Sequence, residues 1–304
     1  MAISRAQLVK ELEPGLNALF GLEYKRYDNQ HAEIYTNESS DRAFEEEVML
    51  SGFANANVKV EGSGVNYDQS QETYTARYTH DTIALAFAIT EEAIEDNLYD
   101  RISSRYTKAL ARSMSNAKQV KAAAPLNNGL PTADGFDSGD GVSLFNTAHT
   151  TVSGTNVKNT LTTQADLNET SLEQALIDIA AFTDERGLRV AAKGVKMIIP
   201  SANQFSAERL LKSQGRTGTA DNDINAVASM GMVPQGYRVN NFLTDSDSWY
   251  IITDVPNGMK MFTRAPLTTA MEGDFDTGNV RYKARERYSF GVSDYRGIFG
   301  CEGA

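Results

Sequence analysis

The chain has 304 residues, of which 41% are hydrophobic and 23% charged, an ordinary globular composition that argues against general disorder. Its formal net charge of −11 argues against a dedicated nucleic-acid-binding protein, because phosphate recognition needs clustered lysine and arginine. The charge remains compatible with a protein that encloses nucleic acid, since enclosure needs a barrier and not attraction.

The single cysteine, Cys301, cannot form an intrachain disulfide, so stability must come from packing and from partners, as in a reducing cytoplasm. The first residues are polar and amphipathic and lack an apolar signal core. No stretch approaches the roughly 18 apolar residues of a membrane span. We therefore expect a chain that is neither secreted nor membrane-spanning.

The N-terminal region predicts a short helix and a loose arm. Apolar residues recur with helical spacing up to Leu12, just before Pro14 and Gly15. Residues 22–41 are polar with little to bury, and predict an arm that another surface must order.

Residues 45–89 predict a long two-stranded excursion with a turn at residues 61–64. Its descending strand places Tyr74 and Tyr78 on one face, where they serve an interface or the core. The alternation slips near His80 and predicts a bend where an exposed strand enters the core. An isolated hairpin is marginal in water, so this one should lie on a neighbour.

A long helix is expected after Thr90, with Glu91 and Glu92 in its first turn. Pro125 and the Asn-Gly pair at residues 128–129 are expected to terminate it. It would span about 33 residues, or about 50 Å at 1.5 Å per residue. Such a helix is a rigid structural support.

The remainder of the chain predicts a loop and a compact α/β unit. Residues 129–170 are rich in glycine and small polar residues, which is typical of an extended loop, and a helix is expected at about 171–186. The α/β unit covers residues 193–257. Its expected elements are strands at 195–199, 237–242 and 249–253, a helix at 202–212 and a loop at 213–225.

The last predicted strand has two different faces. Alternate residues from Val280 to Val292 are mostly apolar, whereas four cations share the opposite face. Four cations on one side of a strand repel each other unless acidic groups face them. The four are Arg281, Lys283, Arg285 and Arg287.

We predict that Glu45, Glu46 and Glu47, at the base of the hairpin, pair with this cationic row within a subunit or across an interface. The alternative is that both are solvated charge runs, since exposed pairs contribute only about 0–1 kcal/mol.

Catalytic and metal-binding patterns are absent from the sequence. His31, His80 and His149 lie in different segments without metal-ligand spacing, and we interpret each as a satisfied polar residue. Ser115 and Lys118 match a Ser-x-x-Lys pattern, but they fall inside the predicted helix without the motifs that should accompany it. Chance is the better explanation.

Two weaker features are also set aside. Asp274, Asp276 and Gly278 lack the spacing and the closing glutamate of a calcium loop, and indicate a turn. Cys301 has no histidine near it in the sequence. The sequence thus predicts no catalytic residue, no metal and no cofactor.

The order of these elements resembles the major capsid protein family with the Hong Kong 97-type fold, which tailed-phage heads and encapsulins share. Similar local sequences are AFAITEEAIEDNLYD at residues 86–100, LFNTAHT at 144–150 and RYSFGVSDYRGIFG at 287–300. Phe145 and His149 in the second of these resemble the Mu-like head-subunit branch. The resemblance covers essentially the whole chain.

The resemblance implies an α+β fold, the Hong Kong 97-like capsid fold, divided into four parts. These are an N-terminal arm (1–44), an extended β-hairpin or E-loop (45–89), a peripheral domain with the spine helix (90–192 and 258–304) and an α/β axial domain (193–257).

The resemblance also implies a function without enzymatic activity. The subunits would self-assemble into pentamers and hexamers of an icosahedral shell that encloses double-stranded phage DNA. The hairpin would lie on one neighbour, the arm on another, and the loop at 213–225 near the local axis. The shell would belong to the virion and assemble in the host bacterial cytoplasm, with separate scaffold, portal and decoration proteins.

Two alternatives stay open. An encapsulin-like compartment would use the same physics to hold enzymes in place of DNA, and an unrecognised hydrolase would need a pocket with convergent titratable groups. The expected assembly contacts are Glu45, Glu46, Glu47, Tyr74, Tyr78, Arg281, Lys283, Arg285 and Arg287.

Overall fold

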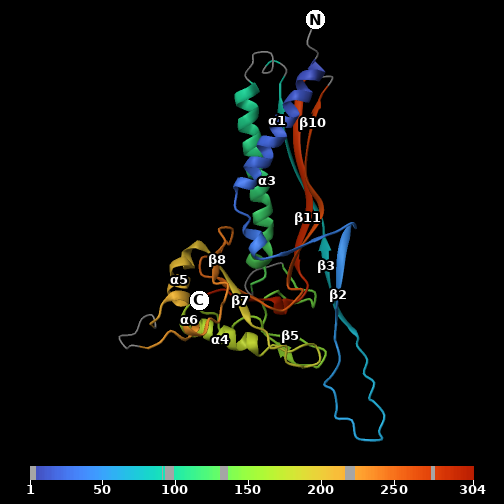
Figure 1. Cartoon of the computed structure of the whole chain (residues 1–304), viewed down its shortest axis with the longest axis vertical. Coiled ribbons are helices and arrows are strands. Elements are labelled where there is room, and N and C mark those ends of the chain that lie inside the picture. The colour runs from blue at the N-terminus through green and yellow to red at the C-terminus, as the bar shows by residue number, and fades with distance from the viewer. Residues whose placement is uncertain (1–4, 91, 93–98, 131–135, 216–222, 275–277) are drawn as a thin grey trace.

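The computed structural model describes residues 5–90, 92, 99–130, 136–215, 223–274 and 278–304. The molecule is elongated, with a long body of two helices and a sheet, a smaller α/β part at one end, and a hairpin that extends away from both (Figure 1). Helices and sheets are mixed, as the α+β expectation requires.

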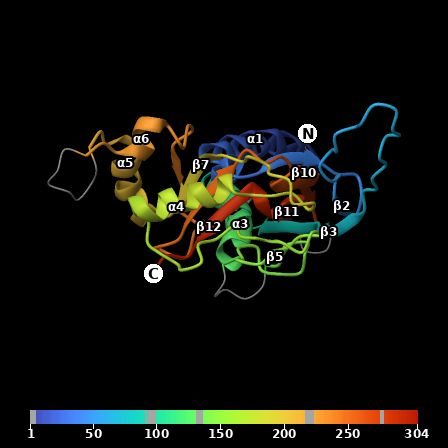
Figure 2. The same ribbon diagram turned by 90° about the horizontal axis from the view of Figure 1, so that it is seen from below.

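The long body is built on a four-stranded sheet in the order β1-β10-β11-β4. Strands β10 (Met259–Gly273) and β11 (Val280–Val292) form a long antiparallel hairpin, β4 (Asp81–Ile89) adds to β11 antiparallel, and β1 (Thr36–Ser39) adds to β10 parallel. Helices α1 (Arg5–Arg26) and α3 (Tyr99–Asn128) lie along this sheet (Figures 1 and 2).

Strand β11 has the two faces that the sequence predicts. Tyr282, Ala284 and Tyr288 are buried, whereas the residues between them, including Lys283 and Arg285, are exposed. Successive side chains in a strand point to opposite faces, so the buried set meets the helices and the cations remain on the opposite face.

The spine helix α3 has the expected lower end, although Pro125 does not terminate it. The helix continues through Pro125 to Asn128. Its last carbonyls are satisfied from outside, since Tyr250 Oη donates to the Leu126 carbonyl at 3.2 Å and Phe136 N–H to the Asn128 carbonyl at 3.2 Å. The predicted start, with Glu91, lies outside the described residues.

The prediction of a short first helix followed by a loose arm is wrong. Helix α1 continues through Pro14 and Gly15, and its Phe20 is buried against α3 and β11. A 3-10 turn, η1 (Gln30–Glu33), and strand β1 then complete the sheet. Burial of apolar side chains offsets the roughly 3 kcal/mol that a proline costs in a helix interior.

The smaller part contains a second four-stranded sheet in the order β12-β9-β7-β8. Strands β7 (Gly194–Ile199) and β9 (Trp249–Thr253) match the prediction, and β8 (Tyr237–Val239) is shorter. Strand β12 (Ile298–Cys301), from the end of the chain, pairs with β9. The sheet of the region that we assigned as axial therefore includes a strand from outside 193–257, and the division into domains stays a prediction.

Helices and short turns surround this second sheet. Helix α4 ends at Ala180, earlier than the expected 186. Gly187, with φ of 84°, closes a separate turn in which its N–H donates to the Asp184 carbonyl at 3.1 Å. The elements are α4 (Glu169–Ala180), α5 (Gln204–Lys212), α6 (Ala226–Met230), η2 (Ser201–Asn203) and η3 (Tyr295–Gly297). Most of the expected axial loop, residues 216–222, lies outside the described residues.

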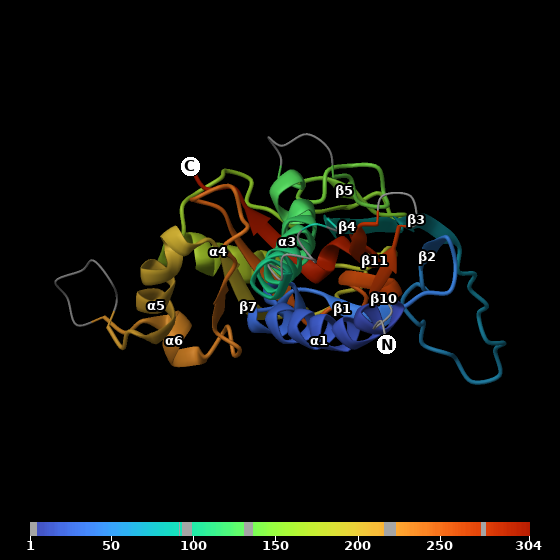
Figure 3. The ribbon, with the colours of Figure 1, turned by 90° about the horizontal axis from the view of Figure 1, so that it is seen from above.

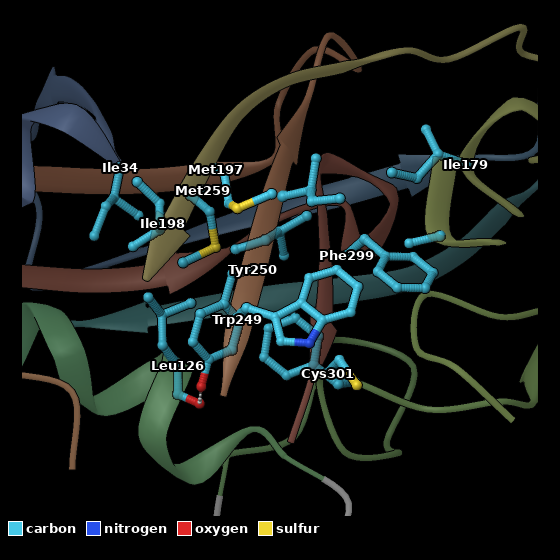
Figure 4. Close-up of a cluster of buried hydrophobic side chains, with 14 of the residues drawn as sticks. Ile34, Leu126, Ile179, Met197, Ile198, Trp249, Tyr250, Met259, Phe299 and Cys301 are labelled. Atoms are coloured by element: carbon cyan, nitrogen blue, oxygen red, sulfur yellow. Dashed lines mark hydrogen bonds between the residues drawn. The ribbon is translucent and has the colours of Figure 1, made fainter. Parts of the chain in front are cut away.

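The core of the smaller part is aromatic. Trp249, Tyr250 and Phe299 are fully buried, with Met197 and Ile198 of β7 beside them (Figure 4). The loop at 129–170 is irregular, as expected, apart from the short strands β5 (His149–Thr150) and β6 (Asn156–Val157). It is also packed, because Leu144 and Phe145 are buried in this core.

Replacement of Phe20 by alanine should lower the free energy of unfolding of the unassembled chain by about 3–5 kcal/mol, because the ring is buried between α1 and the sheet. Leu22→Ala on the same helix is the control, since that side chain is 69% exposed and its loss should change stability by about 0.5 kcal/mol or less. Urea unfolding measures both. Equal stabilities would contradict the docking of α1 on its own subunit.

Stability should also depend on His31. Burial, aided by the charge of Lys118, lowers the pKa of His31 from 6.5 to about 4. The folded chain keeps this ring neutral where the unfolded chain binds a proton, so stability is lost as the pH falls from about 6.5 towards 4. From pH 7 to pH 5 the loss due to His31 should be about 2 kcal/mol.

His31→Gln removes this contribution while the backbone N–H of residue 31 keeps its bond to Gln119 Oε1. Urea unfolding of both chains at pH 7 and pH 5 should therefore show a shallower acid dependence for the variant. Identical pH dependence in the two chains would refute the assignment.

Candidate assembly surfaces

The hairpin leaves the body of the subunit and has no core of its own. Strands β2 (Phe44–Leu50) and β3 (Glu72–Thr79) pair antiparallel, with Phe44 opposite Thr79. Beyond them, residues 51–71 form no strand and reverse at a turn around Gly62, where φ is 82°. The hairpin lies on the opposite side of the molecule from α5 and α6 (Figure 3). The predicted excursion of residues 45–89 is confirmed as far as Thr79, whereas residues 81–89 form strand β4 of the body sheet.

The tip of the hairpin, residues 51–71, is rich in exposed apolar side chains. Val58 is 95% exposed and Tyr67 97%. Large clustered apolar exposure is typical of protein contact sites. The other exposed apolar residues of the tip are Phe53, Val60 and Val65.

One ion pair links the tip to the body. Arg186 Nη2 donates to Asp68 Oδ1 at 2.9 Å, and Asp68 also accepts from the backbone N–H groups of Ala54 and Gln69. Those backbone hydrogen bonds, with Arg186 adding to them, lower the pKa of Asp68. Solvent screens an exposed pair of this kind, so the tip is weakly held.

The base of the hairpin is firmly anchored. His80 lies between β3 and β4, and its ring nitrogens bond Ser40 Oγ and Ser289 Oγ, each at 2.9 Å. The chain passes here from pairing with β2 to pairing with β11, which confirms the predicted bend.

Tyr78 packs into the same junction. Its hydroxyl lies 2.5 Å from Ser293 Oγ, and its ring occupies the space in which a Cβ at position 291 would stand, so only glycine fits there. Tyr74 packs near Tyr295, with ring centroids 6.3 Å apart. Both tyrosines thus lie against their own subunit. Of the two roles expected for them, interface or core, this favours the core.

The three glutamates at the hairpin base have partners other than the β11 cations. Glu47 Oε1 accepts from Lys260 Nζ at 2.6 Å, Glu46 lies 3.7 Å from Arg77, and Glu45 accepts from Ser40 Oγ at 2.6 Å. The within-subunit form of our pairing hypothesis is therefore wrong, because the β2–β3 register places other groups beside these carboxylates.

Lys260 is the buried cation among these partners, with its residue 6% exposed. Burial acts to lower its pKa, but hydrogen bonds to Glu47 and Glu38 outweigh that effect and the pKa is raised. The ammonium group therefore stays charged and ties the hairpin base and β1 to β10.

The cationic row of β11 lies on a shallow surface of small residues. Lys283 is opposite Ala86 on one side and Ala270 on the other. Arg281 pairs with Asp274, and Arg287 Nε donates to the His80 carbonyl at 3.5 Å. For Lys283 and Arg285 the described part of the chain provides no ion pair, so they remain available to a partner.

A polar network that the sequence did not reveal joins the packed loop to the chain end. His149 is fully buried, with Nδ1 2.6 Å from Asp140 Oδ2 and Nε2 3.1 Å from Asn159 Oδ1, and its ring stacks on Tyr295 at 3.9 Å. The interpretation of His149 as a satisfied polar residue is confirmed. No substrate could reach a ring covered in this way.

A second hidden network surrounds Arg296. Its guanidinium lies 2.5 Å from Glu185 Oε1 and 3.2 Å from Asp294 Oδ1, and it donates to the Thr183 carbonyl at 2.8 Å. All three charged residues are buried. Burial raises the pKa of Asp294 in spite of the arginine. Glu185 lies 111 residues from Arg296 in sequence, so no local spacing indicates that pair.

The residues considered for catalysis are structural. Cys301 is buried and burial raises the pKa of its thiol, which is the reverse of what a nucleophile needs. Lys118 pairs with Glu286 at 3.2 Å, and Ser115 is buried. Asp276 lies outside the described residues.

Among the described residues, no three His, Cys, Asp or Glu side chains gather as a metal site requires. Within that same part of the chain, none of the helices has the length and apolar character to cross a membrane.

Comparisons with known proteins agree with this architecture. The capsid of an empty GTA particle matches with a TM-score of 0.59 at 14% identity, covering 91% of each chain. The capsid of Myoviridae phage XM1 matches with a TM-score of 0.53 at 12% identity over 89% of each chain. A virus-like particle from Pyrococcus furiosus matches with a TM-score of 0.52 at 11% identity, over 94% of this chain and 98% of that one.

These likenesses show the Hong Kong 97-like capsid fold. No curated protein sequence matches the chain. A family model described as phage capsid protein matches residues 73–300, which is most of the chain. The chain therefore belongs to the phage capsid protein family, and it is a structural shell protein and not an enzyme.

Proposed function

We propose that this major capsid protein forms its shell by laying the tip of each hairpin on a neighbouring copy, in pentamers and hexamers that enclose double-stranded DNA. The observation that carries the proposal is the tip itself, where Val58 and Tyr67 are the most exposed large apolar side chains among the described residues.

The physical argument is that the tip gains its apolar burial only on assembly. Burial is worth about 25 cal/mol per Å² of apolar surface, and ordering the backbone costs about 1–2 kcal/mol per residue. The net free energy gained when one tip docks is therefore small, and each contact is weak. A closed shell sums many such contacts, and weak contacts let misplaced subunits leave.

The cationic row offers a second contact in this proposal. Lys283 and Arg285 would meet acidic groups of another copy, since their own subunit leaves them unpaired among its described residues. Glu61 and Glu72 of the hairpin are exposed and fit that role. Glu45, Glu46 and Glu47 fit it less well, because each already has a partner.

Further parts of the proposal rest on the family resemblance. They are membership of the Mu-like branch, assembly in the host bacterial cytoplasm, and separate scaffold, portal and decoration proteins. A compartment that holds protein in place of DNA is the second candidate, favoured by the fold that the chain shares with the virus-like particle. Electron microscopy of assembled shells, with a nuclease-protection assay, separates the two.

The first prediction concerns the tip. Val58→Asp/Val60→Asp should abolish shells in electron micrographs, because two charges replace the apolar surface that the neighbour covers. The unfolding free energy of the unassembled chain should change by about 0.5 kcal/mol or less, since both side chains are exposed. Val58→Ile/Val60→Ile keeps the surface apolar and should still form shells. Shells from the aspartate variant would overturn the hairpin contact.

The second prediction concerns the cationic row. Arg285→Glu/Arg287→Glu should prevent or greatly reduce shell formation, because like charges would then face the acidic partner. Arg285→Lys/Arg287→Lys preserves the charge and serves as the control. If the charge-reversed chain assembles as the wild type does, the row has no role in assembly.

A further inference from the structure

The spine helix carries a basic stripe that neither the fold nor the proposed contacts use. Residues 101–130 contain no aspartate or glutamate, although the whole chain has a net charge of −11. Arg105, Lys108 and Arg112 on this helix are all exposed. Their spacing of three and four residues places them on one helix face.

The stripe is distinct from the cations that the fold uses. Lys118 pairs with the buried Glu286, and Lys121 pairs with Asp81. Arg105, Lys108 and Arg112 form no ion pair with any residue that the structure describes. Three unpaired cations of like sign within about 10 Å of helix repel one another, so their arrangement favours an anionic partner.

The stripe and the cationic row of β11 lie on opposite faces of the subunit. Helices α1 and α3 cover one face of the β1-β10-β11-β4 sheet, and the row lies on the other. The row lies near acidic groups, since Glu272 is directly opposite Arg281, which also pairs with Asp274. Within the described residues, no ion pair joins the helix stripe to an acidic group.

From this difference we infer that the helix-covered face is the inner face of the shell, and that Arg105, Lys108 and Arg112 contact the phosphate backbone of enclosed duplex DNA. The inference rests on the proposed function, because it names the partner of one face of the shell. Duplex DNA carries one charge per about 1.7 Å of axis, so about 10 Å of duplex offers more than enough phosphates for three cations.

The contact is independent of base sequence. Side chains projecting from a straight helix reach phosphates, and phosphate contacts carry no sequence information. Such a contact explains how an acidic protein can enclose DNA. Most of the surface repels DNA, whereas one stripe on each subunit makes weak, regularly spaced contacts with the outer layer of the DNA.

The test is a titration of a fluorescent 30-base-pair duplex with the full-length, unassembled chain at several salt concentrations, read by anisotropy. Arg105→Gln/Lys108→Gln/Arg112→Gln should weaken binding at least about tenfold at low salt and reduce the slope of log K against log salt by about 3, roughly one per residue. Arg112→Gln alone should reduce the slope by about 1.

The matched control is Arg281→Gln/Lys283→Gln/Arg285→Gln, which removes the same charge from the opposite face and should leave DNA binding unchanged. The inference is overturned if the wild type does not bind the duplex, if the helix variant binds as the wild type does, or if the control loses as much affinity. Binding of poly-glutamate in place of DNA would also overturn it, because the stripe would then serve an acidic protein.

Electron microscopy of the same variants keeps this test separate from the proposed function. The helix variant should still form closed shells, because assembly depends on the hairpin tip. If the helix variant forms shells and its DNA affinity is unchanged, only the inference is refuted. If the wild type forms no shells, the proposed function is refuted.

Discussion

The buried face of strand β11 holds the long half of the molecule together. Its two edges pair with β10 and β4, and its face carries Tyr282 and Tyr288 against the helices. The hairpin base packs on the opposite face of the same strand, where the ring of Tyr78 occupies the space left by Gly291. One strand thereby fixes sheet, spine helix, N-terminal helix and hairpin relative to one another.

A charged group lies in this otherwise apolar contact. Glu286 is 2% exposed, burial raises its pKa, and Lys118 Nζ donates to its carboxylate at 3.2 Å. An unpaired buried charge is costly, so α3 is stable only where Lys118 reaches Glu286. The pair therefore fixes the position of α3 along the axis of β11. An apolar contact alone would allow the helix to shift along the strand.

The most exposed large apolar side chains lie in the hairpin tip, although Phe205, Ile224 and Met230 of the smaller part are also 71–73% exposed. The N-terminal segment, which we expected to need a partner, is complete in one copy, since α1 covers the sheet and β1 extends it. The tip has neither strand pairing nor apolar cover. A rigid body with one uncovered extension suits a thin shell, because the body keeps its shape while the extension provides the contact.

The sequence alone determined the features that depend on local periodicity. The two faces of β11, the strands β7 and β9, the lower end of the spine helix and the bend at His80 were all predictable, because alternation and helix-ending residues act over a few neighbours. The resemblance to the capsid family was also visible, since it depends on the order of such elements.

Only the tertiary structure decided which faces meet. The continuation of α1 past Pro14, the pairing of β12 with β9, and the partners of Glu45, Glu46 and Glu47 all depend on residues distant in sequence; Glu47 and Lys260 are 213 residues apart. Periodicity states that a face is buried but not what covers it. The register of the long strands decides which residues cover each face. It also decides which cations pair within the subunit and which remain available to partners.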